Sequence, residues 1–186
     1  MSPIAIIILI AIAVIVLAVA ASLYLRSQRT KELRSRFGPE YSHTVKETGD
    51  RGKAEVQLRQ REKRVEKFNI RPLPRGDRTR YLVSWQGVQA EFVDDPPTAV
   101  THADELVGKV MEARGYPVSD FEQRSADLSV DHPTLVQNYR AGHEIALRHE
   151  RGEVGTEELR QAMIHYRTLF EELVAEAQSV PENVAH

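Results

Sequence analysis

The first 25 residues of the chain contain no charged side chain, and residues 4–25 are almost entirely isoleucine, leucine, valine and alanine. About 22 helical residues at 1.5 Å rise each give roughly 33 Å, enough to cross a hydrocarbon core of about 30 Å. From Arg26 onward the chain is rich in charge and suited to water. The sequence therefore predicts a transmembrane anchor at residues 1–25, followed by a part that lies outside the bilayer.

A cleaved signal peptide is the alternative interpretation of the same stretch. Ala18, Val19 and Ala20 form a small-x-small pattern near its end, which suits cleavage. However, no lysine or arginine precedes the apolar run, and the run is longer than the roughly 7–15 residues of a usual signal-peptide core. We favour an uncleaved anchor and keep an exported form as the alternative.

Basic side chains follow the apolar run directly, at Arg26, Arg29, Lys31, Arg34 and Arg36. Positive residues beside a membrane span favour the cytoplasmic side, and they attract anionic lipid headgroups. These five residues are therefore expected to contact the membrane surface. The predicted topology is single-pass in the cell membrane, with the N-terminus outside and the bulk of the chain in the cytoplasm.

The net charge of −2 hides an asymmetry along the chain. Residues 26–67 hold 13 Lys/Arg and 7 Asp/Glu, whereas residues 68–186 hold 12 Lys/Arg and 20 Asp/Glu. This pattern indicates a basic segment beside the membrane and an acidic domain beyond it. The acidic residues within the basic segment argue against a nucleic-acid partner, and anionic headgroups are the expected one.

Two closely spaced prolines, Pro72 and Pro74, divide the polar part of the chain because they favour an extended connection over a helix. We place a basic juxtamembrane helical stalk at residues 26–71 and a helical domain at residues 72–178. A frayed tail is expected at residues 179–186.

Apolar residues in the domain recur three and four positions apart, which is the spacing of amphipathic helices. Ser119 and Glu122 fit a capping box, and Thr156 fits an N-cap. Trp85 and Phe170 are expected to anchor the core, because each is large and central to its apolar stripe. Helices are expected at about 81–92, 94–114, 119–128, 135–147 and 156–177. The predicted fold class is all-α, with a compact bundle of four to five helices behind the anchor and stalk.

One set of side chains resembles a site, and it consists of His132, Tyr139, His143, His165 and Tyr166. The last two long helices could bring these residues together, and histidine titrates near neutral pH. Aromatic residues on a helical stripe usually belong to the core, and no nucleophile stands out among them. Core packing is therefore the preferred interpretation, and a pocket for catalysis is the alternative.

No metal or cofactor is expected from the sequence. His143 and His149 are six residues apart, whereas the zinc-binding helix motif places its histidines four apart on one face. The chain has no cysteine, so no thiolate site or disulfide framework is available. Glycine-rich phosphate loops and nucleophile elbows are absent from the sequence as well.

Several short motifs are similar to those of an uncharacterised family of bacterial single-pass, membrane-anchored helical proteins, often labelled hypothetical or secreted. They are RFGPEY at 36–41, ETGD at 47–50, FVDDP at 92–96, RGYP at 114–117, ADLSVDHP at 126–133 and LRQAM at 159–163. The resemblance spans nearly the whole chain after the anchor. It implies a membrane-anchored helical protein and brings no activity or site residue with it.

These patterns favour a membrane-tethered, non-enzymatic helical interaction or scaffold module, whose partners are the bilayer and an unidentified protein. An enzyme that uses the histidine and tyrosine pocket is the second hypothesis. An exported version of the same module is the third.

Overall fold

The computed structural model describes residues 3–175, and over this range the chain forms eight helices and no strand. The all-α prediction is confirmed. The predicted tail at 179–186 lies outside the described residues, as do the first two positions. The chain divides into two compact units, Met1–Leu58 and Arg59–His186, and each is described by itself.

The first unit begins with α1 (Pro3–Phe37), which is one continuous helix through the apolar stretch and the basic residues. Gly38 adopts a positive φ of 47° and Pro39 opens α2 (Pro39–Thr48), so glycine and proline together break the helix here. α2 ends at Gly49 in the left-handed conformation, and α3 (Arg51–Val65) follows.

Buried apolar side chains occur on all three helices of the first unit. Leu33 and Phe37 of α1 are 3% and 0% exposed, and Tyr41 of α2 and Ala54 and Leu58 of α3 are buried as well. The end of α1 is therefore a structural part of this unit.

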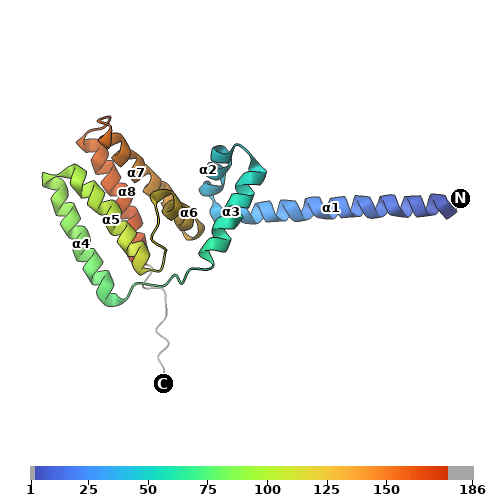
Figure 1. The fold of residues 1–186 in the computed structure, drawn as a ribbon, viewed down its shortest axis with the longest axis horizontal. Coiled ribbons are helices and arrows are strands. Elements are labelled where there is room, and N and C mark those ends of the chain that lie inside the picture. Colours follow the sequence, from blue (N-terminus) through green and yellow to red (C-terminus); the bar gives the residue numbers. More distant parts are fainter. Residues whose placement is uncertain (1–2, 176–186) are drawn as a thin grey trace, which may run out of the picture. The chain divides into compact units, whose positions relative to one another are not determined.

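The second unit contains five long helices, in agreement with the bundle of four to five that the sequence predicts. Figure 1 shows α4 as the outermost helix beside α5, with α8 and α7 beyond it and α6 next to α7. Their bounds are α4 (Arg75–Asp94), α5 (Pro96–Ala113), α6 (Phe121–Asp131), α7 (Leu135–Glu150) and α8 (Thr156–Ala175).

The apolar stripes of these helices meet in one core. Trp85 and Phe170 are 5% and 0% exposed, and their rings stack with centroids 4.7 Å apart and planes at 16°. The two predicted anchors therefore contact each other. The connector before α4 is tied to the bundle by Arg71, whose N–H donates to the Arg114 carbonyl at 2.8 Å.

The last turns of α3 belong to the second unit and are less solvated than their charge suggests. Arg61 is 7% exposed and donates to the Ser129 hydroxyl at 3.2 Å. The Arg64 guanidinium donates to both carboxylate oxygens of Asp127, at 3.0 and 3.3 Å. Burial raises the pKa of Asp127, although the hydrogen bond from Arg64 acts in the opposite direction.

One predicted cap is wrong in detail. The capping box was expected at Ser119 and Glu122, but the side chain of Asp120 accepts the N–H of Gln123 at 2.8 Å and caps α6. The Ser119 hydroxyl contacts the Pro117 carbonyl at 3.5 Å instead. Aspartate and serine are comparable N-caps, so the sequence does not determine which of the adjacent residues Ser119 and Asp120 caps the helix.

Candidate functional site

The basic end of α1 is the first of three candidate sites. All five predicted membrane-contact residues, Arg26, Arg29, Lys31, Arg34 and Arg36, are exposed. Before them, the described side chains of α1 are also exposed, including Leu17 at 69% and Leu23 at 61%. The helical stretch Ile12–Phe37 is long and apolar enough to cross a membrane. Such exposure of large apolar side chains suits a lipid environment better than water.

The charged end of α1 is held by a carboxylate on α3. Glu55 accepts hydrogen bonds from Thr30 at 2.8 Å, Tyr41 at 2.9 Å and Arg51 at 3.1 Å. Burial acts to raise the pKa of Glu55, but these three hydrogen bonds outweigh it, so the pKa lies below its ordinary value. The Arg34 guanidinium lies 5.1 Å from the centroid of the Tyr41 ring, which adds a cation–π contact.

The predicted histidine and tyrosine set is only partly brought together. Tyr139 and Tyr166 are fully buried, with ring centroids 6.2 Å apart in an edge-to-face arrangement. The His143 ring stacks on Phe121 at 3.6 Å between centroids, and Phe121 in turn lies 4.7 Å from the ring of Tyr139. Aromatic packing therefore accounts for these side chains.

The other two histidines of the set have local roles. His165 Nδ1 lies 2.9 Å from the side-chain oxygen of Asn138, in a contact between α8 and α7. His132 is 7% exposed and forms the C-cap of α6, where its N–H donates to the Leu128 carbonyl.

The tyrosine pair has two charged neighbours that the sequence reasoning missed. Asp104 of α5 and Arg124 of α6 form an ion pair of 3.2 Å, with side chains 23% and 19% exposed. The Arg124 guanidinium also lies 5.8 Å from the centroid of the Tyr139 ring. The hydroxyls of Tyr139 and Tyr166 are buried, and neither has a hydrogen-bond partner of ordinary geometry among the described residues.

Burial is the largest effect on both hydroxyls and raises the pKa of Tyr139 and of Tyr166, and the negative charge of Asp104 raises both further. Arg124 opposes this rise without cancelling it. Burial and the nearby carboxylate therefore hold both phenols in the neutral form. They are suited to a polar cluster that joins four helices of the core.

Glycine leaves room for this cluster at two positions. A Cβ on Gly108 would overlap the Arg124 guanidinium, and one on Gly142 would lie 3.1 Å from the Tyr166 ring. Gly108 follows Asp104 by four residues and so shares its helix face. The sequence signal for this cluster was the spacing of Asp104 and Gly108, which lie four residues apart beside the apolar stripe of α5.

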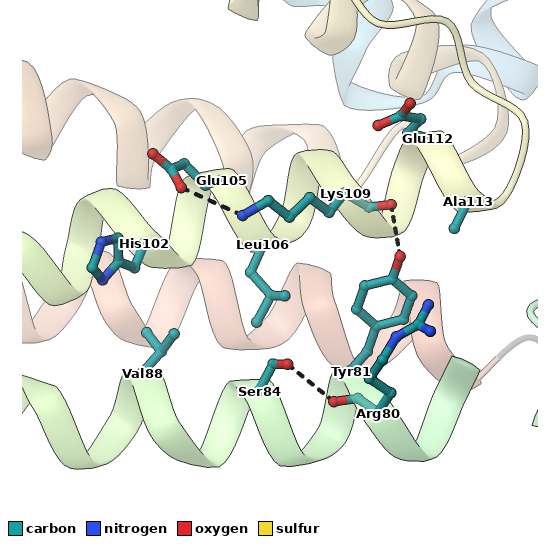
Figure 2. A pocket seen from close by; sticks show the side chains of 10 residues that line it. All are labelled: Arg80, Tyr81, Ser84, Val88, His102, Glu105, Leu106, Lys109, Glu112 and Ala113. Atoms are coloured by element: carbon teal, nitrogen blue, oxygen red, sulfur yellow. Dashed lines mark hydrogen bonds and ion pairs between the residues drawn. The ribbon is translucent and has the colours of Figure 1, made fainter. Parts of the chain in front are cut away.

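A groove between α4 and α5 is the third candidate, with a volume of about 720 Å³ (Figure 2). Leu106 and Val88 are buried at its base, 6% and 8% exposed. Tyr81 donates its hydroxyl to the Lys109 carbonyl at 3.2 Å, and the Lys109 ammonium lies 3.5 Å from the Glu105 carboxylate. The other lining residues are Arg80, Ser84, His102, Glu112 and Ala113. Both signs of charge are present, and the groove contains no nucleophile paired with a base.

Within the described part of the chain, no group of three or more His, Cys, Asp or Glu side chains could hold a metal ion. Comparison of the chain with protein-family models, with curated proteins and with solved structures gives no match.

Proposed function

We propose that this protein is a membrane-tethered helical interaction module whose compact units face the cytoplasm. One observation carries the proposal: α1 exposes large apolar side chains along its described apolar stretch, yet buries Leu33 and Phe37 near its C-terminal end. One continuous helix thus serves as the apolar anchor and runs on into the first unit.

The orientation follows from the basic residues. The five cations from Arg26 to Arg36 are exposed and lie within the zone where positive charge orients a span. They are also placed to contact anionic headgroups on the cytoplasmic leaflet, where each exposed cation contributes about 1 kcal/mol.

An interaction role is favoured because the accessible surfaces suit binding better than catalysis. The groove between α4 and α5 combines an apolar base with charges of both signs at its rim, which suits a protein segment of mixed composition. The unusual polar groups, Tyr139 and Tyr166, are fully buried in the core.

An enzyme that uses Tyr139 and Tyr166 is the second candidate. It is favoured by two buried hydroxyls that lie near the charged Asp104 and Arg124 and have no hydrogen bond of ordinary geometry within residues 3–175. Titratable groups with shifted pKa values often cluster at functional sites, which favours an enzyme. Buried clusters with a purely structural role shift pKa values in the same way, which argues against one. An enzyme would need these hydroxyls to become accessible to a substrate.

Crosslinking in intact membranes tests the interaction role. A photoreactive amino acid at Ser84, in the groove, should form adducts with a specific protein, whereas the same probe at the exposed Glu150 of α7 serves as the matched control. Alkaline extraction in the same experiment should leave the chain in the membrane fraction. Release of the chain by alkali would contradict the tether, and equal adduct patterns at both positions would contradict a specific binding surface.

A further inference from the structure

The outer face of α4 carries a continuous uncharged surface. It consists of Leu82, Val83, Gln86, Gly87, Ala90 and Val93, which we call the outer stripe. These residues recur three and four positions apart, so they share one side of the helix. All are exposed, and the three largest apolar members are 39% (Leu82), 62% (Val83) and 81% (Val93) exposed.

The opposite side of α4 already holds the helix in the bundle. Trp85 and Val88 are buried there, Trp85 stacks on Phe170 of α8, and α5 lies alongside. The fold therefore does not require apolar residues on the outer side. A surface helix with a single core-facing stripe usually carries charged residues on its other face, and the outer stripe departs from that pattern.

Charge is distributed along α4 in a way that selects a partner. Arg75, Arg78 and Arg80 lie toward its N-terminal end, together with Asp77, whose carboxylate lies 2.9 Å from the Arg80 guanidinium. Glu91 and Asp94 lie toward its C-terminal end, so the two ends still differ in the sign of their charge. Arg80 and Asp94 are both exposed and lie about 40° apart around the helix at 100° per residue, on the same edge of the outer stripe. They are separated by roughly 21 Å along the axis.

A second copy of α4 running antiparallel complements this arrangement. In an antiparallel pair related by a two-fold axis, a given edge of one contact face lies beside the same edge of the other. Arg80 and Asp94 share one edge, so Arg80 of each copy approaches Asp94 of the other. A parallel pair would instead place like charges level with one another. A lipid surface carries charge of one sign and does not match a helix that is basic at one end and acidic at the other.

We propose that the outer stripe is a homodimer interface in which two copies of α4 pack antiparallel about a two-fold axis that lies between Gln86 and Gly87. In this register Val83 of one copy lies opposite Ala90 of the other, and two Arg80–Asp94 pairs flank the apolar centre. A symmetric dimer with one self-complementary patch is the commonest oligomer among soluble proteins. Gly87 and Ala90 have small side chains at the middle of the surface. Apart from its chain neighbours and the helix's own backbone, no atom of the described residues lies within 4 Å of a Cβ placed on Gly87.

The proposal deepens the interaction role and rests on it, because the anchor places two copies in one plane and raises their effective concentration. A surface of this modest size therefore suits association on a membrane better than association in dilute solution.

Disulfide crosslinking of the full chain in proteoliposomes tests the interface and its direction. The chain has no cysteine, so any disulfide dimer reports the introduced position alone. Gln86→Cys should crosslink with itself. Val83→Cys and Ala90→Cys should each crosslink weakly alone and efficiently when the two variants are mixed, because the antiparallel register places these positions opposite each other. Efficient self-crosslinking of Val83→Cys without pairing to Ala90→Cys would overturn the antiparallel arrangement, and no crosslinking at any of the three would overturn the interface.

Charge and exposure variants supply the controls. Arg80→Asp should weaken dimerisation roughly tenfold, since two exposed ion pairs become repulsive, and Asp94→Arg added to it should restore dimerisation. Val93→Glu should abolish the dimer, whereas Val118→Glu should not, although the two valines are 81% and 79% exposed. A dimer that survives Val93→Glu, or a charge swap that fails to restore it, would contradict the interface.

The result separates this inference from the proposed function. A chain that stays monomeric in the membrane yet crosslinks to another protein at Ser84 refutes the dimer alone. A chain that dimerises through α4 but is released from membranes by alkali refutes the tether alone.

Discussion

Truncation of the stacked aromatic pair in the bundle should reveal strong coupling between α4 and α8. Trp85 and Phe170 are 5% and 0% exposed with ring centroids 4.7 Å apart, so each fills space against the other. Replacing either by alanine should cost about 3–5 kcal/mol in free energy of unfolding. The stacked contact itself contributes about 0.5–1.5 kcal/mol beyond the buried area.

The double variant should cost less than the sum of the single variants. The second truncation enlarges a cavity that the first has already made, and the stacking contact is lost only once. We expect a coupling energy of at least about 1 kcal/mol, in the range found for residues in contact. Because total stabilities are about 5–15 kcal/mol, Trp85→Phe and Phe170→Leu provide a milder cycle in which the protein stays folded.

Chemical unfolding of the full chain in detergent micelles, followed by far-ultraviolet circular dichroism, measures these free energies. Trp85 is the only tryptophan, so its fluorescence gives an independent reading for the Phe170 variants. If both alanine variants lose less than about 1 kcal/mol in free energy of unfolding, the burial of this pair is refuted, because ordinary surface substitutions have effects of nearly that size. Fully additive losses would refute the stack.

Three further results are expected from thermal unfolding of the full chain. Glu55→Gln should lower the melting midpoint at pH 7 and have less effect in acid. The pKa of Glu55 is lower in the folded state than in the unfolded state, so its carboxylate stabilises the fold above the unfolded-state pKa, and this stability is lost as the pH falls through the folded-state pKa. An equal effect at all pH values would contradict this prediction. Gly115→Ala should destabilise the protein by more than about 1 kcal/mol, because Gly115 has a φ of 100° and a Cβ there would overlap the Asn69 backbone. Gly87→Ala should stabilise the protein by up to about 1 kcal/mol, because Gly87 lies within a helix and has open space around it. Equal effects of the two substitutions would contradict this prediction. Arg124→Met should cost about 1–3 kcal/mol, because it leaves the partly buried Asp104 unpaired, and a neutral result would show that the polar cluster is not stabilising.

The helices were predictable because their determinants are local. Apolar spacing along each segment and the breaks at Gly38, Pro39 and Pro96 fix where helices run, and the structure follows them closely. α4 begins at Arg75, earlier than its apolar stripe indicates, because its first turns are polar and give no periodic signal.

The charged contacts of the core were not predictable in the same way. Arg61 meets Ser129 and Arg64 meets Asp127 across more than 60 residues of sequence, and these pairings depend on how α3 packs on α6. The same reason hid Asp104, whose partner Arg124 lies on another helix. A charge run read along one helix shows its spacing but not which of its members a neighbouring helix will bury.

Topology is the measurement that tests the central claim most directly. A reporter that works only in the cytoplasm and one that works only after export are each fused after His186 of the full chain. A cytoplasmic module predicts activity from the first reporter alone, and replacing the five basic residues between Arg26 and Arg36 by neutral ones should reduce that preference. Activity from the export reporter on the unmodified chain would contradict the account and place the bundle outside the cell.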